Sequence, residues 1–352
     1  MRFHPSEEQI AIQDALRGTL ADTLPSAKLH ALIDGEADLD RPSWDALMAL
    51  GLGGLMLPED QGGSGLGLLD TAMVVEVLGE GGASGPVIPH LMTVLALARS
   101  KNEDAKAKIL PGLVAGETIA TLAFGGNWLP ESWDVSEDAG RGSGVVKFVP
   151  SAPSAGVFLV GLAGGRLALV EAGEGVTVEL HSSIDRTRRM AQVTFANAPA
   201  VLLDTDVAAV IDAGLVLTAA DALGGAQKAL DMSVAYAKER QQFGQPIGRF
   251  QGLKHQLATM ALEVEPARAL VWYAAYAFDA GLEDARRVAA IAKAHLTDRF
   301  VSVIRAAVAA HGGIGYTWEY DLSVWVRRSF YDRAFLGSPV AHRARAAELA
   351  GW

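Results

Sequence analysis

RQQFGQPIGRFQ, residues 240–251, joins two long alanine- and leucine-rich runs. Glycine and proline in its centre are turn residues, so the stretch predicts a connection between two helices. Apolar runs of this length, separated by short turns, are typical of an antiparallel helical bundle. We therefore expect a four-helix bundle whose helices cover about 207–238, 253–280, 282–310 and a shorter run that begins near 320.

Upstream of this region the chain changes character twice. Residues 1–115 are predicted to be helical, because Ser6 precedes two acids and apolar residues such as Leu16 and Leu20 recur at helical spacing. From about 116 to 205, short β-rich runs separated by Gly, Pro and Ser predict a small antiparallel barrel or sandwich. These runs are residues 145–149, 157–160, 167–170, 176–178 and 193–195. The sequence thus predicts an α+β protein: an N-terminal helical domain (1–115), a middle β domain (116–205) and a C-terminal bundle (206–352).

Composition excludes several classes of function. The 352 residues are 50% apolar, which is enough for a large core, and contain no cysteine. Disulfides, thiolate metal sites and thiol nucleophiles are therefore excluded, and we expect a cytoplasmic protein without a metal centre. A net charge of −11 without a basic run argues against nucleic-acid binding. Every long apolar run has a charged, polar or glycine break, so we expect no membrane span.

Residues 240–251 also carry groups that bind nucleotides. Arg240 falls at a predicted helix end, where a cation suits the helix dipole, and its guanidinium can bind a phosphate through two hydrogen bonds. Phe243 offers a face to a planar ring, and the amide of Gln251 can both donate and accept hydrogen bonds. Taken alone, however, the stretch is better explained as an ordinary helix–loop–helix turn with a capping arginine.

A second segment, HGGIGYT at residues 311–317, is rich in glycine. Its three glycines within four positions would let a ligand approach the backbone closely and meet free N–H groups. The segment follows a helix and lacks Gly-Lys-Ser/Thr, so it is neither a Walker A loop nor a dinucleotide fingerprint.

Together, these two segments resemble the paired signatures of the acyl-CoA dehydrogenase family. Residues 49–59, 62–66 and 76–79 resemble the first helical domain of the same family, so the likeness covers nearly the whole chain. It implies an FAD enzyme that removes two hydrogens from the α and β carbons of an acyl-CoA thioester. FAD would accept a hydride, a glutamate would take the α proton, and an electron-transfer flavoprotein would receive the electrons.

The resemblance also implies that FAD lies between subunits. The residues that would hold the adenine and diphosphate end of a neighbouring chain's FAD are Arg240, Phe243, Gln251, His311, Gly312 and Gly313. The family usually has a glutamine three positions before the first of these glycines, whereas this chain has Ala309. One hydrogen bond from a side chain to the cofactor is therefore expected to be missing.

Both places where the family keeps its catalytic glutamate lack a carboxylate. The usual Tyr-Glu-Gly-Thr stretch corresponds to residues 335–338, where Leu336 stands in place of glutamate. The alternative position, on the helix before Arg240, corresponds to Gly214. Asp332 and Asp221 are the nearest candidates for a displaced base, although the simplest interpretation of each is a solvated or capping carboxylate.

The flavin-ring segments of the middle domain also depart from the family. The corresponding stretches are residues 122–130 and 147–149, and both have lost the usual residues. The leading hypothesis is a subunit that completes the FAD site of a homologous partner, which brings the base. A self-sufficient homo-oligomer with a displaced base is the second hypothesis. The third is a binding or scaffold protein that uses no flavin.

Overall fold

The computed structural model describes residues 4–125 and 128–352. Its secondary structure runs from N-terminal helices through a β region to C-terminal helices, which confirms the predicted α+β class. The chain forms two compact units, made of residues 1–31, 72–83 and 215–352, and of residues 32–71 and 84–214. The predicted boundaries near 115 and 205 lie where helix gives way to strand and strand to helix. As domain boundaries they stay a prediction.

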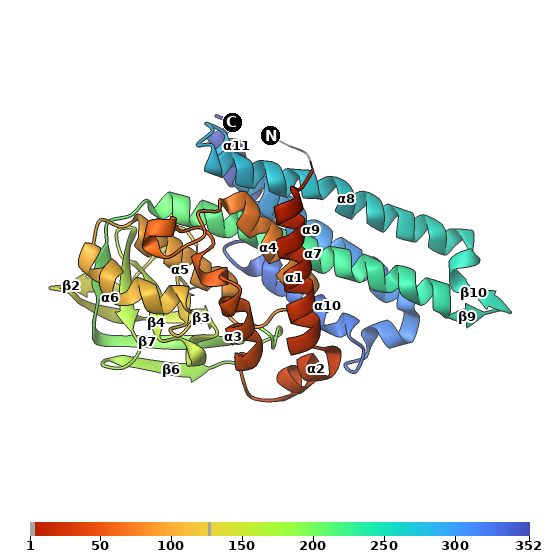
Figure 1. Cartoon of the computed structure of the whole chain (residues 1–352), viewed down its shortest axis with the longest axis horizontal. Helices are drawn as coiled ribbons and strands as arrows, with labels where there is room; N and C mark the ends of the chain where they lie inside the picture. The colour runs from red at the N-terminus through yellow and green to blue at the C-terminus, as the bar shows by residue number, and fades with distance from the viewer. Residues whose placement is uncertain (1–3, 126–127) are drawn as a thin grey trace. The chain divides into compact units, whose positions relative to one another are not determined.

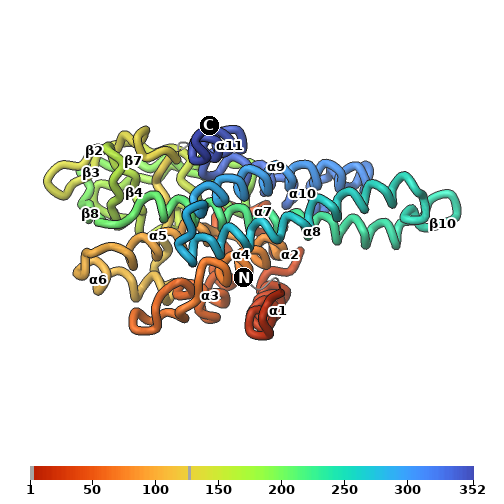
Figure 2. The backbone as a smooth tube through the Cα atoms, turned by 90° about the horizontal axis from the view of Figure 1, so that it is seen from above, coloured from red at the N-terminus to blue at the C-terminus, as the bar shows by residue number. Residues whose placement is uncertain are grey.

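The first unit is a bundle of long helices. Its C-terminal part consists of α7 (Val207–Glu239, which begins in the second unit), α8 (Gln251–Asp279), α9 (Ala285–His311), α10 (Leu322–Ala334) and α11 (Pro339–Leu349). Helix α9 packs against α8, α10 and α11. In both Figure 1 and Figure 2, α7 and α8 form a long hairpin. Four of these helices are the predicted ones, and α11 is an addition.

Helix α7 is largely buried. It is long and apolar enough to cross a membrane, the only such helix in the described ranges, but 83% of its most apolar window is buried inside the protein. A Cβ on Gly224 would overlap the carbonyl of Glu76 in α4 (Leu68–Glu80), and one on Gly225 would overlap the ring of Phe300 in α9. Glycine costs a helix about 1 kcal/mol relative to alanine. The two glycines therefore serve the close approach of two neighbouring helices.

Helix α1 (Glu7–Thr23) begins as its sequence predicts. The Ser6 hydroxyl accepts the Gln9 N–H at 3.1 Å, and the Gln9 side chain accepts the Ser6 N–H at 2.8 Å. This capping box satisfies two backbone donors that the first helical turn leaves free. Leu16 and Leu20 are buried, and α2 (Ser26–Asp34) follows after a short turn.

The second unit contains two four-stranded sheets. Their strand orders are β1-β4-β5-β8 and β2-β3-β7-β6. Both sheets contribute to one apolar core, with Phe158 and Val160 from the first and Val193 and Phe195 from the second. The strands are β1 (Ala120–Ala123), β2 (Ser136–Asp138), β3 (Arg141–Pro150), β4 (Val157–Leu162), β5 (Arg166–Glu171), β6 (Val176–Leu180), β7 (Met190–Pro199) and β8 (Val201–Leu203). All five predicted strands are present. The expectation of a wholly antiparallel arrangement is wrong, because β1 pairs with β4 in parallel.

The remaining helices of the second unit surround a buried histidine. These helices are α3 (Arg41–Ala49), α5 (Val87–Arg99) and α6 (Glu103–Val114). His90 of α5 lies with one ring nitrogen 3.0 Å from the Leu113 carbonyl oxygen, while the other accepts the Ala120 N–H at 3.1 Å. Burial lowers the pKa of His90 to about 4, so the ring is neutral at pH 7. A neutral ring with one donor and one acceptor links α5 to α6 and β1.

Candidate functional site

The turn between α7 and α8 has a strained backbone and an exposed aromatic ring. Strands β9 (Gln241–Gln242) and β10 (Gln245–Pro246) pair antiparallel around Phe243 and Gly244, whose φ angles are 53° and 75°. Two positive φ values are those of a type I′ turn, which costs a bulky residue about 1–3 kcal/mol. Yet Phe243 is 91% exposed. A strained, solvent-facing ring is a surface suited to a ligand or to another chain.

The glycine turn after α9 leaves its backbone open to the outside. Gly312 has φ 66° and ψ −142°, a conformation that residues with side chains rarely adopt. A Cβ on Gly312 or Gly313 would meet no atom within 4 Å, whereas a Cβ on Gly315 would lie 2.8 Å from that of His311. Gly315 is therefore required for packing. Gly312 and Gly313 instead leave space on the outer side of the turn, through which a phosphate group can approach the backbone.

His311 brings the glycine turn beside the end of α7. Its ring stacks on that of Tyr236 with a centroid distance of 4.6 Å, and Tyr236 lies one helical turn before Arg240. The Arg240 N–H donates to the Tyr236 carbonyl at 2.8 Å, which fixes the helix end. The His311 ring is itself buried and lies 2.8 Å from the Ala307 carbonyl oxygen. The structure therefore gives this predicted cofactor residue a packing role, and leaves the glycines after it exposed.

The exposed groups around this junction fit a dinucleotide cofactor. Arg240 is exposed, and within the described chain no carboxylate lies at ion-pair distance from its guanidinium. Gln251, the first residue of α8, is also exposed. A diphosphate requires a cation and open backbone N–H groups, which Arg240 and the glycine turn provide. A planar ring requires an aromatic surface, which the exposed ring of Phe243 provides. We call Arg240, Phe243, Gln251, Gly312 and Gly313 the bundle tip. Figure 1 shows the β9–β10 hairpin of this tip at the end of α7 and α8.

The two positions expected for a base lie in different surroundings. Gly214 is buried within α7. Leu336 lies in the turn after α10 with a φ of 54° and is 7% exposed. His342 lies with Nε2 2.6 Å from the Leu336 carbonyl oxygen. Burial and the nearby Lys293 lower the pKa of His342 to about 4, so the neutral ring donates this hydrogen bond through its Nε2–H.

Lys293 holds the same turn from α9. Its ammonium, fully buried, donates to the carbonyl oxygens of Asp332 at 2.8 Å and Gly337 at 3.0 Å. These carbonyls belong to the C-terminal end of α10 and the turn that follows, where a cation suits the helix dipole. Burial lowers the pKa of Lys293 from 10.5 to about 7, against the opposing effect of Asp332.

The expectation that Asp221 and Asp332 are solvated or capping carboxylates is wrong. Asp221 is 1% exposed, and Arg328 donates to both of its oxygens, at 2.9 Å from Nε and 2.6 Å from Nη2. Asp332 is fully buried and lies in the electrostatic field of Lys293. Buried carboxylates are tolerated where cations compensate their charge. Both candidates for a displaced base therefore have structural partners.

A cavity in the second unit brings together the two stretches that were matched to the flavin-ring segments. It has a volume of about 430 Å³ and is lined by Phe124, Gly125, Lys147 and Phe148, among others. A β-bulge between Val146 and Val149 turns Phe148 outward with a φ of 60°. Gly126 and Asn127, part of the first stretch, lie outside the described residues.

One wall of this cavity was not predicted from the sequence. The ring of Trp133 stacks on Phe124 with a centroid distance of 4.6 Å, and it rests on Gly161 of β4, where a Cβ would overlap it. The glycine inside an otherwise apolar strand was the available signal. Within the described ranges, no group of three or more His, Asp or Glu side chains is arranged to hold a metal ion.

Comparisons with curated proteins identify the family. Residues 6–117 match the acyl-CoA dehydrogenase N-terminal domain, and residues 207–350 match the C-terminal domain. The acyl-CoA dehydrogenase FadE34 of Mycobacterium tuberculosis is 31% identical over 94% of this chain. IpdE2 of Mycolicibacterium smegmatis, also an acyl-CoA dehydrogenase, is 29% identical over 95% of it. The chain spans 96% of IpdE2 but only 46% of FadE34, about half that relative's length.

Solved structures agree with this assignment. A variant of the Tcur3481-Tcur3483 steroid ACAD has a TM-score of 0.91 and 30% identity, with 98% of each chain covered. PigA with FAD and proline has a TM-score of 0.90 and 26% identity, covering 100% of this chain and 99% of PigA. The fold, the two domain models and these relatives agree, and the chain belongs to the acyl-CoA dehydrogenase family.

Proposed function

We propose that this chain is a subunit of an oligomeric acyl-CoA dehydrogenase and completes the FAD site of a homologous partner. The observation that carries the proposal is the bundle tip. There, the exposed Arg240, the exposed ring of Phe243 and the open turn at Gly312 lie at one end of the helices. An exposed aromatic group on a strained turn is stabilised when another molecule covers it.

Each group at the tip has a defined role toward FAD. Arg240 would bind the diphosphate through two charge-assisted hydrogen bonds, and Gly312 and Gly313 would let the phosphates reach the backbone. Phe243 would pack on the adenine, and Gln251 would donate or accept a hydrogen bond. FAD held by these residues would supply two-electron, hydride-accepting chemistry at the β carbon of the acyl group. Ala309 cannot supply the side-chain hydrogen bond that glutamine makes in the family.

The missing base supports a partner. Leu336 and Gly214 cannot take a proton, and Asp221 is held on both oxygens by Arg328. Removal of the α proton requires a base within hydrogen-bond reach of that carbon. We therefore assign proton abstraction to the partner, and the binding of the adenine end of FAD to this chain.

The comparisons favour such an assembly and suggest a substrate. The similar steroid ACAD carries two protein names, and the match to FadE34 leaves more than half of that relative free for a second unit of comparable size. A bulky, steroid-bearing acyl-CoA is therefore the first substrate to test. As in the family, an electron-transfer flavoprotein is the proposed electron acceptor.

A self-sufficient homo-oligomer is the second candidate, and the cavity beside Phe124 and Phe148 is the observation that favours it. The cavity has a volume of about 430 Å³ and lies at the stretches matched to the flavin-ring segments. The chain therefore has space for a ligand at these stretches. In this case the chain would hold FAD by itself, and its base would come from a residue outside the two usual positions.

The deciding experiment purifies the chain alone and together with homologous chains encoded beside it. We expect the chain alone to be colourless and inactive, and the co-purified assembly to hold fewer than one FAD per chain and to oxidise acyl-CoA. One flavin on every chain of the protein alone, with turnover, would establish the homo-oligomer instead. Protein that remains colourless in every assembly would support a scaffold.

The same preparations test the tip. Arg240→Ala removes a charge-assisted pair of hydrogen bonds, so the dissociation constant for FAD should rise about 10- to 100-fold. Arg305→Ala is the matched control, since Arg305 is an exposed arginine of α9 in the same unit. Flavin retention that is equal in the two variants would contradict a diphosphate role for Arg240.

A further inference from the structure

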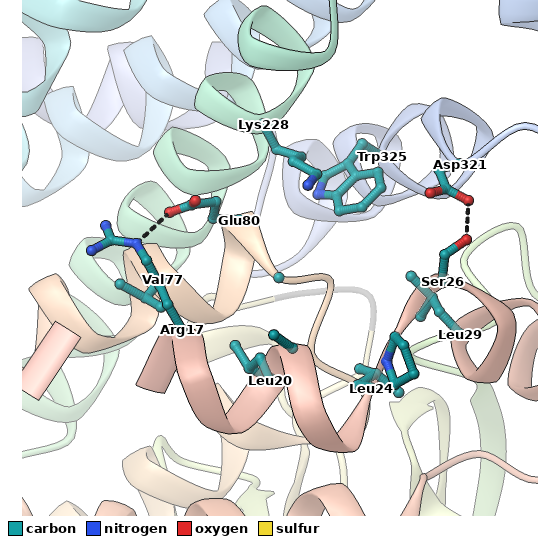
Figure 3. Close-up of a pocket in the computed structure, with 13 residues that line it drawn as sticks. Arg17, Leu20, Leu24, Ser26, Leu29, Val77, Glu80, Lys228, Asp321 and Trp325 are labelled. Carbon is teal, nitrogen blue, oxygen red and sulfur yellow. Dashed lines mark hydrogen bonds and ion pairs between the residues drawn. The ribbon is translucent and has the colours of Figure 1, made fainter. Parts of the chain in front are cut away.

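A separate cavity of about 290 Å³ lies in the first unit, among helices α1, α2, α4, α7 and α10 (Figure 3). It is distinct from the bundle tip. Lys228, which lines it from α7, precedes Arg240 by twelve residues, or about 18 Å along a helix. None of the residues discussed above for FAD or for the base lines this cavity.

The floor of the cavity is apolar. It is formed by the buried side chains of Leu20, Leu24, Leu29 and Val77. The indole of Trp325 forms a wall and is fixed in place, because its Nε1–H donates to the Gly79 carbonyl at 3.0 Å. Such a surface favours an aliphatic chain, because burying the chain against it removes apolar area from water.

Most charged groups around the cavity already have partners. Arg17 pairs with Glu80 at 3.3 Å. The carboxylate of Asp321 accepts the Ser26 hydroxyl at 2.6 Å, and His30 Nε2 lies 2.9 Å from the same oxygen. Figure 3 shows the Arg17–Glu80 pair and the Ser26–Asp321 pair on opposite sides of the apolar floor.

Lys228 is the exception. Its ammonium is half-buried and lies 5.5 Å from the centre of the Trp325 ring. Among residues 4–125 and 128–352, no carboxylate is within ion-pair distance of it. The face of an indole attracts a cation and so stabilises it in part when no counter-ion is present. The Lys228 ammonium therefore remains able to bind the carboxylate of a ligand.

We propose that this cavity binds a small amphiphilic carboxylate, with its carboxylate on Lys228 and its aliphatic chain on the leucine floor. The volume is at the low end for ligand pockets, which suits a short aliphatic acid rather than a whole coenzyme A thioester. The proposal is independent of the flavin and needs no catalytic step. It assigns the chain a second ligand site, within a single subunit.

The test uses the full chain and three probes of equal chain length: octanoate, octan-1-ol and octylamine. Isothermal titration should give saturable binding of one octanoate per chain, and binding of the alcohol and the amine at least tenfold weaker. Lys228→Met keeps the length of the side chain but removes the charge, and should weaken octanoate binding about tenfold. Lys238→Met, an exposed lysine of the same helix, is the matched control and should bind octanoate as the wild type does.

A second variant tests the cavity without touching the charge. Ala21 lines the cavity from an exposed position on α1, so Ala21→Trp should fold, fill the space and abolish octanoate binding. The proposal is overturned if octanoate shows no saturable binding, if Lys228→Met and Lys238→Met bind it equally, or if Ala21→Trp leaves binding intact. Octylamine that binds more tightly than octanoate would assign the cavity to Asp321 and would overturn it as well.

Discussion

At the scale of single residues, the buried pair of Asp221 and Arg328 gives the sharpest prediction. Removing the charge from one partner leaves the other buried without compensation, which costs about 3–5 kcal/mol. Asp221→Asn should therefore lower the free energy of unfolding by that amount in chemical denaturation followed by tryptophan fluorescence. Asp231→Asn, at an exposed position of the same helix, should change it by less than about 0.5 kcal/mol. Equal stability of the two variants would show that the pair contributes nothing.

At the scale of elements, Lys293 donates hydrogen bonds to the C-terminal end of α10 and the turn after it. Burial lowers its pKa from 10.5 to about 7, so between these values the unfolded chain binds more protons than the folded chain. Stability therefore rises with pH across this range, and below pH 7 the full cost of burying the charge remains. Lys293→Met lacks this dependence. Relative to that variant, the wild type should gain roughly 1–3 kcal/mol between pH 7 and 9.

The measurement is a series of denaturation curves at pH 7, 8 and 9. Lys254→Met, at an exposed position of α8, serves as the control, and its profile should run parallel to that of the wild type. A difference between wild type and Lys293→Met that stays constant with pH would mean that the amine keeps its ordinary affinity for protons in the folded protein.

At the scale of the whole molecule, each unit contains a buried neutral histidine. Burial lowers the pKa of His90 in the second unit and His342 in the first from 6.5 to about 4. Between pH 6.5 and 4 the unfolded chain takes up protons that the folded chain does not, so stability falls as the pH falls through this range. Each histidine contributes at most on the order of 3 kcal/mol, and below pH 4 neither adds further loss.

Glutamine variants separate the two contributions. His90→Gln and His342→Gln keep a side-chain N–H donor but do not titrate, so each should flatten the acid limb of the unfolding profile between pH 6.5 and 4.5. The variants will be less stable than the wild type at pH 7, because glutamine does not reproduce the ring contacts. An acid limb as steep as that of the wild type in both variants would contradict the assignment.

Elements with a long repeating pattern of apolar residues were predictable from the sequence, and short elements were not. The runs at 207–238 and 282–310 were recognised because apolar residues repeat along them, and they became α7 and α9. Strand β1 was missed because Ala120–Ala123 is short and carries no alternation that distinguishes a strand from a helix. Its parallel pairing with β4 depends on a segment more than 30 residues away, and local pattern contains no information about it.

The amino-acid sequence by itself determined the family, the long helices of the bundle, most of the strands and the two segments now found at the bundle tip, because these depend on residues close together in the chain. Only the tertiary structure decided that Asp221 is paired with Arg328, that Phe243 is exposed while His311 is buried, and that Lys228 faces an apolar cavity. Burial and ion pairing depend on partners that are distant in the sequence, such as residues 221 and 328. Their electrostatic consequences therefore appear only when the chain is folded.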